Sequence, residues 1–156
     1  MRFLADGMLG RLARWLRVLG HDVLYAPDLD DRALARLARL EGRLLLTRDV
    51  ALARQRGVPA LLITSDRLDD QLLQVARQLR LSLETPGLTR CLACNTPLVA
   101  ASRDQAAGRV PPYVLATQPR LSQCPACQRF YWPGTHWARM QEHLARLRGQ
   151  LETTCG

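Results

Sequence analysis

Four of the five cysteines occur in two C-x-x-C pairs, a spacing that is typical of metal binding. The pairs are Cys91 with Cys94 and Cys124 with Cys127. Each pair places two thiolates on one tight turn, and two such turns supply the tetrahedral sulfur set of structural zinc, with no position left open for chemistry. We therefore expect one structural zinc ion, held in a small ribbon that buries too little apolar surface to fold without metal.

Two other interpretations of these cysteines remain open. Cys124 and Cys127 could form a redox dithiol, although such a motif belongs at a strand-to-helix turn of an α/β unit, and this pair lies elsewhere. His136 could replace one thiolate as a ligand, although four sulfurs already suffice. The fifth cysteine, Cys155, has no assigned role. The odd number and paired spacing favour metal in a reducing compartment over disulfides, so we expect a cytoplasmic protein.

Aspartates follow the end of every strand expected in the first part of the chain. They are Asp6, the turn containing Asp28, Asp30 and Asp31, then Asp49 and Asp66. Because the carboxyl ends of parallel strands meet at one edge of a sheet, we expect these side chains to gather there. A divalent cation would offset their repulsion, and oxygen ligands favour Mg²⁺ or Mn²⁺. Such an ion lowers the pKa of a bound water and neutralises the charge that develops in phosphodiester hydrolysis.

Each aspartate also has an ordinary structural explanation. Asp31 and Asp49 could cap helix N-termini, and Asp6 with Gly7 could form a turn. Any one residue alone would favour these explanations. The repetition of the same residue type after each strand favours a shared site.

The elements that would position these residues alternate between short apolar runs and helical periodicity. Strands are expected at residues 2–5, 22–25, 43–47 and 59–64, and helices at 8–19, 31–40, 49–57 and 69–81. This order predicts an α/β fold with a parallel sheet flanked by helices. A turn-rich segment with the four paired cysteines follows, then a helix at 138–147. We therefore expect an α/β domain at 1–84, a zinc ribbon at 85–137, and a C-terminal helix and tail at 138–156.

The charge of the chain suits an anionic partner such as nucleic acid, and on charge alone a solvated basic surface without a partner explains it equally well. The net charge is +8, and every basic residue is an arginine, whose planar fork of donors matches phosphate oxygens. The apolar content of 47% is enough for a core, but no apolar run is long enough to cross a membrane. The aromatic segment at 130–137 could stack unpaired bases, although filling the small core of the ribbon is the favoured interpretation.

Three motifs resemble the Mut-seven C-terminal RNase domain family (Mut7-C). They are the segment from Asp6 to Gly20, the sequence Leu46-Thr-Arg-Asp49, and the two cysteine pairs followed by Tyr131-Trp-Pro-Gly-Thr-His136. The resemblance implies a PIN-like nuclease fold with a zinc ribbon, and a metal-dependent ribonuclease that cuts RNA phosphodiester bonds. A non-catalytic RNA-binding adaptor with a vestigial acidic pocket is the alternative.

The resemblance also implies roles for particular residues. Asp6 and Asp49 match acidic positions of the family, and Asp31 matches the acidic residue that opens the second helix. Asp28 and Asp30 compete with Asp31 for that position, and Asp66 matches a fourth position for which Ser65 is an alternative. These aspartates would hold catalytic Mg²⁺ or Mn²⁺. The arginines expected near the RNA phosphates are Arg11, Arg14 and Arg48.

Overall fold

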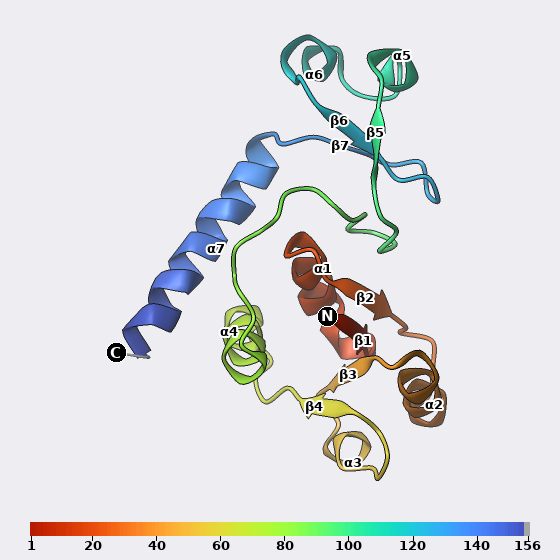
Figure 1. The fold of residues 1–156 in the computed structure, drawn as a ribbon, viewed down its shortest axis with the longest axis vertical. Helices are drawn as coiled ribbons and strands as arrows, with labels where there is room; N and C mark the ends of the chain where they lie inside the picture. The colour runs from red at the N-terminus through yellow and green to blue at the C-terminus, as the bar shows by residue number, and fades with distance from the viewer. Residues whose placement is uncertain (155–156) are drawn as a thin grey trace.

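The computed structural model describes residues 1–154, so Cys155 lies outside the described residues. A four-stranded parallel sheet forms the centre of the first part of the chain, in the order β2-β1-β3-β4 (Figure 1). Its strands are β1 (Arg2–Ala5), β2 (Asp22–Tyr25), β3 (Leu44–Thr47) and β4 (Ala60–Leu62). The predicted α/β fold with a parallel sheet flanked by helices is confirmed.

Helices cover both faces of this sheet because its strands are apolar on both sides. The helices that follow the strands are α1 (Gly10–Val18), α2 (Asp31–Glu41), α3 (Val50–Ala53) and α4 (Leu68–Leu79). Phe3 and Ala5 face a core shared with α1 and α4, whereas Leu4 between them faces a second core shared with α2 and α3. Each helix therefore starts at the edge of the sheet where the strands end, which is the edge with the predicted aspartates.

Two details of these helices differ from expectation. The helix expected at 49–57 is a single turn, α3, because its apolar positions run out at Ala53 and Gly57 adopts a left-handed conformation with φ of 75°. The helical periodicity predicts Arg17 on the polar face of α1 with Arg11 and Arg14, but Arg17 is buried. Its Nε and Nη2 donate to the carbonyl of Val23, and its Nη1 donates to the carbonyl of Leu92 in the ribbon. Arg17 therefore joins the two parts of the chain.

A glycine directly after the helix expected at 8–19 predicts a helix stop at Gly20; the structure confirms this stop, and the position requires glycine. A 3-10 turn, η1 (Gly7–Leu9), precedes α1, which ends at Val18. Gly20 has φ of 90°, and a Cβ atom there would lie 2.7 Å from Cγ of Pro86. The linker thus packs directly against the end of α1.

A small antiparallel sheet and two short helices build the ribbon. Its elements are β5 (Val99–Ala101), α5 (Arg103–Ala106), α6 (Pro112–Thr117), β6 (Leu121–Gln123) and β7 (Phe130–Tyr131). Phe130 and Trp132 pack against a core centred on Ala106 and Val114, which agrees with the favoured interpretation of the aromatic segment. β5 and β6 pair as antiparallel strands, and α5 and α6 form the connection between them. Ser102 starts α5 with a capping box.

The C-terminal helix returns to the first part of the chain. It begins three residues earlier than expected and extends beyond Gly149, as α7 (Thr135–Thr154). Trp137, Met140, Leu144 and Leu147 belong to the same core as α1 and α4. In Figure 1, α7 runs from the ribbon down along α4. None of the described helices has the length and apolar character that membrane spanning requires.

A polar junction attaches the ribbon to the edge strand β2. The Asn95 side chain accepts a hydrogen bond from the Val23 N–H (2.9 Å) and donates to Asp22 (2.7 Å). Asp22 also accepts from Arg43, which is only 5% exposed, at 2.8 Å. Burial alone would raise the pKa of Asp22, but the hydrogen bonds from Arg43 and Asn95 and the charge of Arg43 lower it to about 2. The carboxylate therefore stabilises the fold fully above pH 3.8, and this stabilisation is lost as the pH falls through about 2.

Asp22→Asn should lower the free energy of unfolding at pH 7 by about 2–3 kcal/mol, because it removes the closer carboxylate partner of the buried Arg43 charge and leaves only Glu41 at 3.6 Å. Urea unfolding of the zinc-loaded protein measures the change. The control Asp104→Asn removes an exposed carboxylate from α5 and should change stability by less than about 0.5 kcal/mol. Equal stability of the two variants would contradict the role given to this junction.

Candidate metal centres

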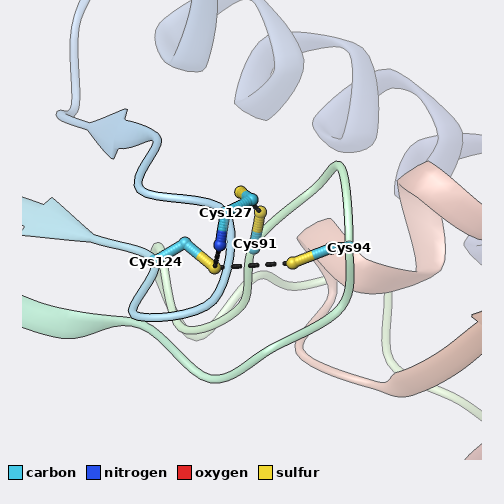
Figure 2. Close-up of side chains that lie close together, drawn as sticks. All are labelled: Cys91, Cys94, Cys124 and Cys127. Atoms are coloured by element: carbon cyan, nitrogen blue, oxygen red, sulfur yellow. Dashed lines mark hydrogen bonds between the residues drawn. The ribbon is translucent and has the colours of Figure 1, made fainter.

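The four paired cysteines come together at the base of the ribbon, and their sulfur atoms all lie within 4.8 Å of one another. Figure 2 shows Cys91 and Cys94 on one loop facing Cys124 and Cys127 on another. Sulfur atoms of Cys91 and Cys127 are 3.5 Å apart, and those of Cys94 and Cys124 are 3.4 Å apart. A tetrahedral site with Zn–S bonds of about 2.3 Å needs sulfur separations of about 3.8 Å, so the residues fit zinc. These cysteines can hold a metal ion such as zinc.

The two cysteine turns have the same backbone hydrogen bonds, which explains why their sulfurs converge. In each, the carbonyl of the first cysteine accepts from the N–H four residues later: Asn95 to Cys91 (2.9 Å) and Gln128 to Cys124 (3.0 Å). Asn95 and Gln128 both adopt left-handed conformations, with φ of 75° and 69°. Sequence analysis missed Asn95, although its place four residues after the first cysteine, as a residue tolerant of positive φ, was a usable signal.

The electrostatics of this cluster favour a bound cation. A hydrogen bond with the Thr96 hydroxyl lowers the pKa of Cys94 to about 6. At Cys127 a backbone hydrogen bond favours the thiolate, but burial and the sulfurs of Cys91 and Cys124 raise the pKa to about 11. One thiolate thus opposes the ionisation of the next. A divalent ion removes this opposition, because each ligand binds it as a thiolate.

At the sheet edge, Asp6 and Asp49 are linked through Thr47, the last residue of β3. The buried Thr47 hydroxyl donates to Asp6 Oδ2 at 2.5 Å and accepts from the Asp49 N–H at 3.0 Å. Asp6 Oδ1 also accepts from the Met8 N–H, which fixes this carboxylate further. Sequence analysis missed Thr47, although a threonine that ends a buried apolar strand two residues before an aspartate was a visible signal. The structure therefore brings two predicted aspartates to one place.

Asp31 is a third member of this acidic group. The pKa of Asp31 is raised, first by partial loss of water contact. The charge of Asp49, a hydrogen bond to Asp49, and the charges of Asp6 and Asp30 raise it further. Asp49 and Asp6 therefore lie close enough for their charges to act on Asp31. Asp30 caps α2 by accepting from the Ala33 N–H at 2.8 Å, so the capping role considered for Asp31 belongs to Asp30. Asp49 does cap a helix, α3, as considered.

Asp66 has different neighbours. It lines a cavity of about 530 Å³ with Arg11, Trp15 and His143, between the N-terminal ends of α1 and α4. No described contact joins it to Asp6, Asp31 or Asp49. Within residues 1–154, the cysteine cluster is also the one group of potential ligand atoms gathered as closely as a metal site requires. The carboxylate oxygens are therefore near one another but not yet in the geometry of a bound ion.

Two of the three predicted RNA-binding arginines, Arg11 and Arg14, lie on α1, and Arg48 lies between β3 and α3. Arg11 and Arg14 project from the exposed face of α1 and line a joint cavity of about 240 Å³ with Trp15 and His136. Arg48 lies between Thr47 and Asp49, and its Nε is buried without a hydrogen-bond partner among the described residues. His136 is exposed and is not part of the cysteine cluster.

Comparison with known proteins gives one match. A family model described as the Mut7-C RNAse domain matches residues 1–144, which is most of the chain. Comparisons with curated proteins and with solved structures returned no match. The match includes both the acidic sheet edge and the cysteine cluster, and it supports a ribonuclease role. The chain belongs to the Mut7-C RNase domain family.

Proposed function

We propose that the protein is a metal-dependent ribonuclease that hydrolyses RNA phosphodiester bonds at the acidic edge of its sheet. The observation that carries the proposal is the Asp6–Thr47–Asp49 link with Asp31 beside it, in a chain of an RNase family. The PIN-like assignment of the sheet, the cytoplasmic location and the division at residues 84 and 137 belong to the same proposal. They rest on the sequence arguments given above.

The residues of the acidic edge divide into fixed and adjustable ligands. Asp6 is 8% exposed and held by two hydrogen bonds, so it provides a fixed oxygen. Asp31 and Asp49 are exposed and can turn toward a cation that their charges attract. Mg²⁺ or Mn²⁺ bound here would polarise the phosphate and lower the pKa of a water molecule. Asp66 is the fourth proposed ligand, and the three arginines extend the site along the RNA, with Arg48 next to Asp49 in the chain.

In this proposal the zinc is structural. Four thiolates leave no open position on the metal, so the ion takes no part in the cleavage. Its role is to hold the two cysteine turns together, and with them the Asn95 and Leu92 contacts that attach the ribbon to β2 and α1. The zinc centre thereby stabilises the surface next to the proposed RNA site.

Incubating the zinc-loaded protein with a mixed pool of labelled RNAs, with and without added Mn²⁺, tests the proposal. We expect cleavage that depends on Mn²⁺. Because the reaction is hydrolysis, each cut should leave a phosphate on one new end and a hydroxyl on the other. Chelators are avoided because they would also remove zinc. Salt-dependent RNA binding without cleavage at any Mn²⁺ concentration would contradict the proposal and support the adaptor instead.

A further inference from the structure

A continuous trough connects the ribbon to the N-terminal ends of α1 and α4. Two cavities of about 350 and 310 Å³ lie against the ribbon and share Arg14, Tyr131 and Trp132. A third, of about 240 Å³, shares Arg14 with both, and a fourth, of about 530 Å³, shares Arg11 and Trp15 with the third. Because neighbouring cavities share their walls, they form one surface feature, which we call the α1 trough. In Figure 1, α1 lies between the ribbon and α4.

The walls of the α1 trough combine positive charge with aromatic faces. Arg11 and Arg14 are exposed, and neither side chain has a hydrogen bond or ion pair within residues 1–154. Arg109 and Arg129 add positive charge at the ribbon end, where the Arg109 guanidinium lies 5.4 Å from the centre of the Phe130 ring. Two acidic side chains, Asp66 and Asp69, lie at the other end of the trough. Asp69 is paired with His143 at 2.7 Å. Free arginines beside aromatic rings suit a phosphate chain with unpaired bases.

The cavity of about 350 Å³, which is lined by several aromatic side chains of the ribbon, has one highly exposed aromatic residue in its wall. Tyr113 on α6 is 68% exposed and lines the 350 Å³ cavity together with Tyr131 and Trp132. A side chain so exposed adds little to the ribbon core, which is formed by other residues. Cavities of this size hold small planar ligands. An aromatic ring that remains in water at the mouth of such a cavity can stack on a base at little cost in ordering.

We propose that the cavity beneath Tyr113 binds an unpaired RNA base, and that the α1 trough guides the strand from this base to the acidic sheet edge. The inference rests on the proposed function for its ligand, RNA, and adds the binding path and the need for an unpaired base. Arg14 and Arg11 contact the phosphates between the base and the cut. The zinc ribbon thereby sets the distance between the bound base and the cleaved bond.

The test is the affinity for a short fluorescent single-stranded RNA, measured by anisotropy in the zinc-loaded protein without added Mn²⁺, so that cleavage does not interfere. Tyr113→Ala should weaken binding by about tenfold to a hundredfold, because one stacked base is lost. Arg14→Gln should weaken it and lower the slope of log affinity against log salt by about 0.7. The controls Val99→Ala, exposed on β5, and Arg36→Gln, exposed on α2, should bind within about twofold of the parent.

A second arm uses RNAs that lack one base at successive positions. One position should weaken binding to the parent protein, yet have no effect on Tyr113→Ala, because both changes remove the same contact. Equal binding by Tyr113→Ala and Val99→Ala, or no sensitive position, would overturn the inference. If the trough contacts hold but Mn²⁺ gives no cleavage, the proposed ribonuclease fails and the binding path stands. If cleavage occurs and Tyr113→Ala has no effect on binding, the proposed ribonuclease stands and the binding path fails.

Discussion

Replacing Asp6 and Asp49 together by asparagine should lower Mn²⁺-dependent RNA cleavage by about a thousandfold or more. Thr47 links the Asp6 carboxylate to the backbone N–H of Asp49, and both carboxylates act on Asp31, so removing their charges removes the attraction for the cation that stabilises the transition state. Such stabilisation is worth several kcal/mol, and each 1.36 kcal/mol corresponds to about tenfold in rate. Initial rates of cleavage of a single labelled RNA measure the effect.

The fold of this double variant should be retained. Asparagine keeps an oxygen that can accept the Met8 and Leu52 N–H bonds, and the loss of two like charges near Asp31 relieves repulsion. Thermal unfolding should therefore change by only a few degrees. A charge-matched control, Asp104→Asn with Glu142→Gln, alters two exposed residues on α5 and α7 and should cleave at the parental rate. Similar rates for both double variants would show that the acidic edge is not the reaction site.

Cys124→Ser should cause the largest loss of stability, confined at first to the ribbon. Cys124 is fully buried, and its sulfur contacts that of Cys94. The substitution therefore removes one of the four thiolate ligands at a buried position. Metal binding supplies about 10–16 kcal/mol in small zinc peptides, and the ribbon core is too small to replace that energy. We expect loss of bound zinc and rapid proteolysis between residues 88 and 134, with the sheet more resistant.

The remaining cysteine provides a matched control for this experiment. Cys155→Ser also removes one thiol, but it leaves all four members of the cluster in place. Metal analysis should find about one zinc per chain in this control and in the parent protein, and much less in Cys124→Ser. Undiminished zinc in Cys124→Ser, or no zinc in the parent, would contradict the zinc assignment.

The sequence was sufficient to predict elements whose signal is local. The strands at Arg2–Ala5 and Asp22–Tyr25 are short apolar segments bounded by turn residues, and they occur where expected. The helix expected at 49–57 was too long because Asp49 gives a strong start signal, whereas the early stop depends on the turn before β4. The helices α5 and α6 were missed because four and six residues are too few to show a period.

The candidate sites show the same division. The cysteine cluster was predictable because both turns carry their ligands at a fixed spacing. The neighbours of Asp66 in space were not predictable, because they depend on how α1, α4 and α7 pack around Trp15 and His143. Arg17 could not be expected inside, since its burial requires carbonyls from β2 and from the ribbon. Contacts between distant segments decide these cases, and periodicity along one segment does not report them.

Mn²⁺ binding measured by calorimetry tests the central claim, that the acidic sheet edge holds a hard cation, most directly. The zinc-loaded parent protein should give a saturable heat for at least one Mn²⁺ per chain, and the Asp6→Asn, Asp49→Asn double variant should give none at the same concentrations. The parent's zinc content, checked before and after, should not change. Absence of saturable binding in the parent, or identical heats from both proteins, would contradict the account.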